Sequence, residues 1–83
     1  MNEIYIIGTI NGKIEFKFVV NNKRYFSKVK FKLKTLDKQT LKIVCYNDVA
    51  DSILKSIKER DKIIIRGRIN SKSEIEIKEY NKV

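Results

Sequence analysis

The feature that most constrains the fold is a run of ten residues, 26–35 (FSKVKFKLKT), in which lysine and apolar residues alternate. Side chains at every second position lie on one face of a β-strand, whereas a helix would spread these lysines around its circumference. The run therefore predicts a strand whose inner face is Val29, Phe31 and Leu33. Its outer face would carry Phe26, Lys28, Lys30, Lys32 and Lys34.

The same period of two precedes this run. Residues 4–20 predict one long strand that bends at Asn11-Gly12, because glycine tolerates the geometry of a bulge or a kink. By alternation, the second half of this strand would turn four side chains toward the core: Ile14, Phe16, Phe18 and Val20. Asn21-Asn22 then predicts a two-residue hairpin turn, which would pair Phe18 with Tyr25.

Further along the chain, residues 41–46 predict a third strand that pairs with the lysine run and places Lys42, Val44 and Tyr46 outward. From Asp48 the apolar residues follow the period of a helix, with Asn47 or Asp48 as its cap and Arg60-Asp61 as its end. Strand alternation returns in residues 63–69, with Ile69 inward. It returns again in the last strand, where Ile75 and Ile77 would point inward and Glu74 and Tyr80 outward.

Three strands, one helix and two strands are the element order of a known small barrel. We expect an all-β protein, a five-stranded Greek-key barrel of the OB type with one α-helix between strands 3 and 4. An SH3-like barrel also has five strands, but a three-turn helix at this point argues against it. With 83 residues, the chain predicts a single nucleic-acid-binding domain over residues 1–83.

The positive charge is concentrated in one part of the sequence. The chain carries a net charge of +9, and the segment from Lys13 to Lys42 alone has ten basic and two acidic residues. An AT-rich genome would raise the lysine content everywhere, which accounts for the total but not for this placement. A basic protein with such a local excess is expected to bind a polyanion.

The outward lysines of the two paired strands form the candidate binding surface. Lys30, Lys32, Lys34 and Lys42 would be adjacent, with no acidic residue among them, and phosphates would offset their mutual repulsion. A strand kept soluble by edge lysines is the alternative. Phe26 and Tyr46 would lie on the same face, where unpaired bases can stack on their rings, and this favours single strands. Phe26 could instead cover a barrel end or an oligomer contact.

Two further groups of side chains would also point outward. Arg66 and Arg68, on either side of Gly67, are candidate nucleic-acid contacts or ordinary surface charge. Tyr5, Ile7 and Ile64 would form an apolar outer patch, which predicts a homodimer or a higher homo-oligomer through the first strand.

The residues needed for most other functions are missing. The chain has no His and one Cys, Cys45, which alternation places in the core, so no metal site, cofactor or cysteine nucleophile is expected. No glycine-rich phosphate loop is present, and we expect no enzyme activity. The start of the chain, Met1 to Ile4, lacks the pattern of a targeting segment, and no apolar run could enter a membrane. A reducing cytoplasm is the expected location.

Three stretches carry a family resemblance: NEIYIIGTI at residues 2–10, IVCYNDVAD at 43–51 and DKIIIRGRI at 61–69. In these the chain resembles the bacterial single-stranded DNA-binding protein family and the primosomal replication protein of the same fold. The resemblance implies an OB fold, sequence-tolerant binding of single-stranded DNA, cytoplasmic DNA metabolism and assembly through the first strand. It also implies that Tyr46 is a stacking residue and that Arg66 and Arg68 occupy polar positions of strand 4.

The chain also departs from that family. Family members have long loops with stacking tryptophans nearby, whereas here the loops are short, and Thr40 and Glu74 lie where rings would be expected. Arg60 stands where a glycine usually follows the helix, and the acidic C-terminal tail is lacking, which indicates a minimal form. We expect a non-enzymatic protein of DNA replication, recombination or mobile-element maintenance. An RNA-binding OB protein and an OB protein-interaction module with an acidic partner remain alternatives.

Overall fold

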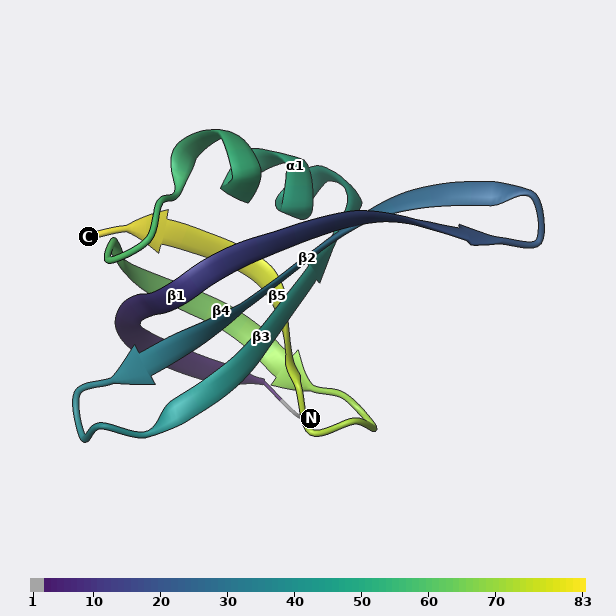
Figure 1. Cartoon of the computed structure of the whole chain (residues 1–83). Coiled ribbons are helices and arrows are strands. Elements are labelled where there is room, and N and C mark those ends of the chain that lie inside the picture. Colours follow the sequence, from purple (N-terminus) through teal and green to yellow (C-terminus); the bar gives the residue numbers. More distant parts are fainter. Residues whose placement is uncertain (1–2) are drawn as a thin grey trace.

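The computed structural model describes residues 3–83. Met1 and Asn2 lie outside it; both belong to the segment examined for targeting, and Asn2 also begins the first stretch that resembles the family. Its elements are β1 (Ile4–Asn21), β2 (Arg24–Thr35), β3 (Thr40–Tyr46), α1 (Asn47–Ser56), β4 (Lys62–Ile69) and β5 (Ile75–Lys82). The strands close a barrel in the order β1-β2-β3-β5-β4 (Figure 1). The predicted element order and barrel are confirmed.

Strand β1 closes the barrel because it pairs with two neighbours. Residues Ile4 to Thr9 of β1 pair with β4, and residues Gly8 to Asn21 pair with β2. The pairing with β2 is interrupted between Asn11 and Glu15, at the bend that the sequence predicted. Gly12 lies in this interruption with φ at 88°, a left-handed backbone that glycine adopts without steric cost.

The core fills the barrel and extends to the helix. Inward side chains of all five strands pack together, among them Val29, Leu33 and Ile65, and α1 adds Ala50 and Ile53. Helix α1 lies across one side of the barrel (Figure 1). Ser27, buried on β2, anchors the start of α1, because its hydroxyl donates to the Asp51 Oδ1 atom at 2.9 Å and also contacts the Asn47 carbonyl at 3.3 Å.

The ends of α1 differ from the prediction. The helix is preceded by Tyr46 in extended conformation, and no side chain caps it, so the expected cap at Asn47 or Asp48 is not formed. The helix ends at Ser56 rather than at Arg60-Asp61, because Ile57 is extended and turns its side chain into the core. Asp61 instead closes the following turn by accepting the Lys58 backbone N–H at 2.8 Å.

The hairpin turn lies one residue later than predicted. Asn22 and Lys23 both have positive φ, and Asn21 pairs with Arg24, so Phe18 lies opposite Ser27 rather than Tyr25. Moving the turn by one residue shifts the pairing by two, and a shift of two keeps every side chain on its face. The predicted faces of β1 and β2 therefore survive the error in register.

The outer half of this hairpin leaves the barrel, which the sequence did not predict. We call residues 16–28 the arm, and Figure 1 shows it projecting beyond the other strands. Four side chains on one face of the arm were expected in the core or paired with core residues. They are exposed instead: Phe16 (37%), Phe18 (69%), Val20 (64%) and Tyr25 (78%). We call them the aromatic face of the arm. They lie beyond the reach of the barrel interior.

Strand β5 contains a bulge that alternation alone could not locate. Gly67 pairs with Ile77 and Arg66 with Glu79, so Lys78 is an extra residue on β5. The faces therefore switch after Lys78, and Tyr80, expected outward, packs against the core. Ile69, expected inward, is 48% exposed at the end of β4. In the part of the chain that the structure describes, no helix is long and apolar enough to cross a membrane.

Candidate nucleic-acid interface

The outward residues of β2 and β3 form one surface, as predicted. The observed register places Lys28 opposite Tyr46, Lys32 opposite Lys42 and Lys34 opposite Thr40. We call this surface the lysine surface and define it by the outward side chains that the register brings together: Phe26, Lys28, Lys30, Lys32, Lys34, Lys42 and Tyr46.

A hollow of about 490 Å³ opens where β1 bends away from β2. Four lysines from three strands line it, Lys13, Lys30, Lys32 and Lys42, together with one carboxylate, that of Glu15. The break in pairing between Asn11 and Glu15 creates this space, because β1 there moves away from the edge of β2. The hollow concentrates positive charge in a recess, where the field of the lysines is stronger than on a flat face.

A second hollow of about 260 Å³ continues the first toward the arm. It is lined by Glu15, Phe16, Lys17, Lys28 and Lys30, so the two hollows share Glu15 and Lys30. We call the two together the basic groove. Lys13 and Lys17 were missed as site residues, although their alternation with Ile14 and Phe16 already placed them on the outer face of β1.

Two aromatic rings stand beside the basic groove. Phe26 and Tyr46 meet edge to face, with ring centroids 5.9 Å apart, and the Lys28 Nζ atom lies 5.8 Å from the Tyr46 ring centroid. Both rings are half-buried, so each keeps part of its surface free. Burial raises the pKa of the Tyr46 hydroxyl, with Glu76 and Glu74 adding to the effect, and the ring is therefore neutral at physiological pH. Phe26 supports Tyr46 in this arrangement.

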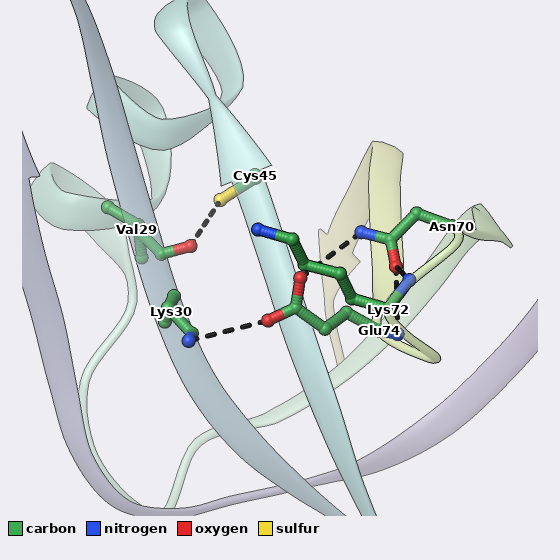
Figure 2. Close-up of polar contacts among 6 residues, drawn as sticks. All are labelled: Val29, Lys30, Cys45, Asn70, Lys72 and Glu74. Atoms are coloured by element: carbon green, nitrogen blue, oxygen red, sulfur yellow. Dashed lines mark hydrogen bonds and ion pairs between the residues drawn. The ribbon is translucent and has the colours of Figure 1, made fainter. Parts of the chain in front are cut away.

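One expectation about this surface is wrong, because a carboxylate lies among the lysines. Glu74, from the turn between β4 and β5, is buried, and its Oε2 atom lies 3.4 Å from Lys30 Nζ (Figure 2). Lys30 pairs with Val44 of β3, so the ion pair passes over Val44. Val44 was expected to point outward, and on this face it is fully buried.

Asn70 holds Glu74 in place from within the same turn. The Asn70 side-chain amide donates to the Glu74 carboxylate at 3.2 Å, and its Oδ1 atom accepts the backbone N–H groups of Lys72 and Glu74 at 2.9 and 3.0 Å (Figure 2). The Asn70 hydrogen bond, followed by the hydrogen bond and charge of Lys30, holds the pKa of Glu74 below its ordinary value. The carboxylate is therefore ionised at neutral pH.

Lys28 interacts with Glu74 and with several neighbouring lysines. Burial lowers the pKa of Lys28, and the charges of Lys17, Lys30 and Lys72 lower it further against the opposing effect of Glu74. Lys17, Lys28, Lys30 and Lys72 thus lie near one another, with Glu74 and Glu15 as the carboxylates of this region. An arriving phosphate would relieve the repulsion that remains.

The two arginines lie apart from the basic groove. The guanidinium of Arg66 is bound by the carboxylates of Glu3 and Glu79, the latter at 2.9 Å, and these contacts raise its pKa. Arg68 pairs with Glu76 on β5, and Glu76 pairs with Val44 on β3, which pairs with Lys30 on β2. Two residues, Val44 and Glu76, therefore lie between Lys30 and Arg68 across the sheet. The structure brings neither arginine to the lysines.

The outward apolar patch on β1 and β4 is present as predicted. Tyr5 pairs with Arg66 and Ile7 with Ile64, and Tyr5 and Ile64 are 68% and 40% exposed. This patch lies on the strands that do not carry the lysine surface. The patch uses the first part of β1, whereas the groove is lined by β1 residues from Asn11 onward, so the two surfaces share no residue.

Cys45 and the acidic residues give no sign of another site. Cys45 is buried, its thiol contacts the Val29 carbonyl (Figure 2), and burial raises its pKa to about 12, so it packs as an apolar group. Within residues 3–83, no group of three or more histidine, cysteine, aspartate or glutamate side chains is placed to hold a metal ion.

Comparisons with solved structures identify the architecture. The SSB domain of a Synechococcus sp. protein superposes with a TM-score of 0.74 at 20% identity, covering 93% of this chain and 88% of the other. This chain has the OB fold. The mitochondrial single-stranded DNA-binding protein Rim1 from S. cerevisiae shares this OB fold with a TM-score of 0.77 at 16% identity, covering 98% and 92% of the two chains.

A deletion mutant of the single-stranded DNA-binding protein from Thermus aquaticus also has a similar OB fold, with a TM-score of 0.85 at 12% identity. All of this chain is covered, and it spans 41% of that protein's chain. No protein-family model and no curated protein matches the sequence. At such identities the likeness establishes the OB fold alone.

Proposed function

We propose that this OB-fold protein binds single-stranded DNA without sequence preference and without catalysis. The observation that carries the proposal is the basic groove, a recess lined by lysines of β1, β2 and β3 that ends beside the Phe26–Tyr46 pair. Lysines in a recess bind phosphates through charge, and exposed ring surface binds unpaired bases. The names of the structural neighbours, which describe single-stranded DNA-binding proteins, support the same function.

The character of the groups in the groove argues for tolerance of sequence. Apart from Glu15, the charged groups that line it are lysines, which bind phosphate as point charges and do not discriminate between bases. A ring such as Tyr46 stacks on any base. Because Phe26 packs against Tyr46, only part of each ring is free to stack on a base. Most of the affinity would then come from the lysines, so we propose a shallow site whose affinity depends strongly on salt.

The proposal extends to assembly and setting. The exposed patch around Tyr5 and Ile64 supports a homodimer through β1, because apolar side chains on an outer sheet face are stabilised when a second copy covers them. We propose a cytoplasmic protein that acts in DNA replication, recombination or mobile-element maintenance. Lys34, next to the groove on β2, would extend the path of the DNA, and Arg68 would do so only beyond Val44 and Glu76. Arg66, bound by Glu3 and Glu79 beside Tyr5, would first have to release these carboxylates.

The test is binding of labelled oligo-dT, oligo-rU and duplex DNA at two salt concentrations. We expect oligo-dT to bind more tightly than duplex, and the Lys30→Ala, Lys32→Ala, Lys42→Ala triple variant to bind more weakly. Three lost phosphate contacts would reduce the slope of log affinity against log salt by about 2, at roughly 0.7 per phosphate. The matched control is Lys55→Ala, Lys58→Ala, Lys62→Ala, which removes the same charge outside the groove.

The outcomes separate the alternatives. Absence of oligonucleotide binding at low salt contradicts the proposal and favours an interaction module for an acidic protein. Tighter binding of oligo-rU than of oligo-dT identifies an RNA-binding protein. Equal losses in the two triple variants mean that net charge, rather than the groove, determines the affinity.

A further inference from the structure

We propose that the aromatic face of the arm packs against the same face of a second copy of this chain, with the two arms antiparallel. This contact is separate from the one proposed through Tyr5 and Ile64 on β1 and β4, and it does not depend on DNA binding. It would join two copies while leaving both basic grooves open.

The two faces of the arm differ in charge. The register places Lys17 opposite Lys28, and Arg24 lies farther out on the same face. The aromatic face is the other one, and within residues 16–28 it carries no charged side chain. Two copies packed through their aromatic faces would keep these basic side chains on opposite outer sides. Like charges on this face would therefore not oppose the contact.

The exposed ring surface is large enough to be an interface. Phe18 is 69% exposed and Tyr25 is 78% exposed, on an arm that projects from the barrel (Figure 1). With Phe16, these rings leave on the order of 350 Å² per copy in water, at about 200 Å² for a whole aromatic side chain. Two copies would cover roughly twice this area, and Val20 and the backbone of the arms bring the total toward the roughly 1,000 Å² of a specific interface. We expect a dimer that dissociates on dilution.

Part of the aromatic face is already ordered in a single copy. The rings of Phe16 and Phe18 meet edge to face, with centroids 5.2 Å apart. A contact that exists before association reduces the side-chain entropy that is lost on binding. Two such arms can stack face to face as the sheets of a β-sandwich do, with their side chains interdigitating.

The two ends of the aromatic face carry opposite charges. At the base of the arm, the Ser27 hydroxyl contacts the Asn47 carbonyl at 3.3 Å and the Asp51 Oδ1 atom at 2.9 Å, so the start of α1 lies beside this end. Asp48 and Asp51 are exposed there. Lys23, in the turn at the tip of the arm, is exposed as well. The aromatic face thus runs from an acidic base to a basic tip.

This polarity selects the antiparallel arrangement. A two-fold axis near the middle of the arm would place the tip of each arm over the base of the other, with Lys23 of one copy near Asp48 of the partner subunit. Parallel arms would instead bring the two Lys23 side chains together. In the two-fold arrangement each favourable contact occurs twice, because the same surface is used by both copies.

Sedimentation equilibrium without DNA tests the contact, in a Tyr5→Ala, Ile64→Ala protein that lacks the contact proposed through β1. We expect this protein to form a dimer as its concentration is raised. Adding Phe18→Ala and Tyr25→Ala should raise the dissociation constant of the dimer about 100-fold or more, since each ring is lost twice. Leu36→Ala, at an equally exposed apolar residue outside the arm, is the matched control and should leave the dimer intact.

Charge reversal at two exposed positions tests the antiparallel arrangement. In the same protein, Lys23→Glu alone should weaken the dimer several-fold, because the new carboxylate would face Asp48. Combining Lys23→Glu with Asp48→Lys should restore the affinity. Lys38→Glu, in the turn between β2 and β3, changes the net charge equally and should not weaken the dimer.

The outcomes separate the arm contact from DNA binding. A Tyr5→Ala, Ile64→Ala protein that stays monomeric at every concentration overturns the contact, and so does a dimer that Phe18→Ala and Tyr25→Ala leave unchanged. If the charge pair does not restore the dimer, the antiparallel arrangement is wrong. If oligo-dT fails to bind while the arms associate, the proposed function fails and the arm contact stands.

Discussion

The Lys30 Nζ atom lies 3.4 Å from the Glu74 Oε2 atom, so an ion pair joins β2 to the β4–β5 turn above the buried side chain of Val44. Lys30 lines both hollows of the basic groove. In the free protein Glu74 therefore takes the place that a phosphate oxygen would take beside this lysine. Binding of DNA has to compete with a carboxylate that the fold supplies.

Substitution Glu74→Gln should therefore increase the affinity for oligo-dT. Glutamine keeps the shape of the side chain and an oxygen for the Asn70 amide, but it removes the negative charge beside Lys30. Because the lysine is partly exposed, the ion pair is worth about 0.2–1 kcal/mol, which corresponds to an increase of up to about fivefold at low salt. Fluorescence anisotropy with labelled oligo-dT measures it.

The control for this prediction is Glu59→Gln, which changes the net charge equally at an exposed residue beyond α1. We expect a smaller gain in affinity from this variant, since it is not in contact with the groove. An equal gain in the two variants would show that the overall charge matters and the Lys30–Glu74 pair does not.

The same residue should make stability depend on acid. The pKa of Glu74 lies below its ordinary value of 4.5 in the folded protein, chiefly because of the Asn70 hydrogen bond, so the ionised form stabilises the fold. This contribution is complete above pH 4.5 and is lost as the pH falls through the lowered pKa. We expect Glu74→Gln to be less stable than the wild type at pH 7, by about 1 kcal/mol.

Urea unfolding at pH 7 and at pH 3 measures this difference. The free energies of unfolding of the wild type and of Glu74→Gln should approach each other at the lower pH, because below pH 4.5 the unfolded wild type takes up a proton at this carboxylate more readily than the folded protein does. A gap that stays constant between the two pH values would show that packing, rather than the charge of Glu74, separates the two proteins.

The fold was predictable because its strongest signals are local. Alternation along residues 26–35 and 41–46 gives the faces of β2 and β3, and the predicted pairing of these two strands is observed. These faces also predicted the lysine surface. The position of a bulge such as Lys78 does not follow from alternation, because an extra residue looks like any other until the partner strand is known.

The arm and Glu74 were beyond prediction for a different reason. Phe16, Phe18 and Val20 alternate as core residues do, and only the extent of the barrel decides that they lie outside it. Glu74 reaches Lys30 from a turn that is distant in sequence, and β3 lies between β2, which carries Lys30, and β5, which follows that turn. Both features depend on the closure of the sheet, which is a global property of the chain.

Removal of the Tyr46 ring should weaken binding without changing its dependence on salt. A ring that stacks on a base contributes about 1–3 kcal/mol, so Tyr46→Ala should reduce the affinity for oligo-dT at least fivefold at every salt concentration. Tyr46→Phe keeps the ring and should bind nearly as the wild type does. If the phenylalanine variant loses as much as the alanine variant, the hydroxyl rather than the ring makes the contact.

The last prediction concerns Gly67, where β4 lies against β5 with no room for a side chain. A Cβ atom at this position would lie 2.3 Å from the Glu76 carbonyl oxygen, which belongs to the backbone and cannot turn away. Gly67→Ala should therefore lower the free energy of unfolding by about 1–3 kcal/mol. The matched control is Gly12→Ala, where φ is 88° and nothing lies within 4 Å of the added atom, so only backbone strain of about 1 kcal/mol or more opposes it. Chemical unfolding of both variants compares the steric cost at Gly67 with the backbone cost at Gly12. A Gly67→Ala protein as stable as the wild type would contradict the close approach of β4 and β5.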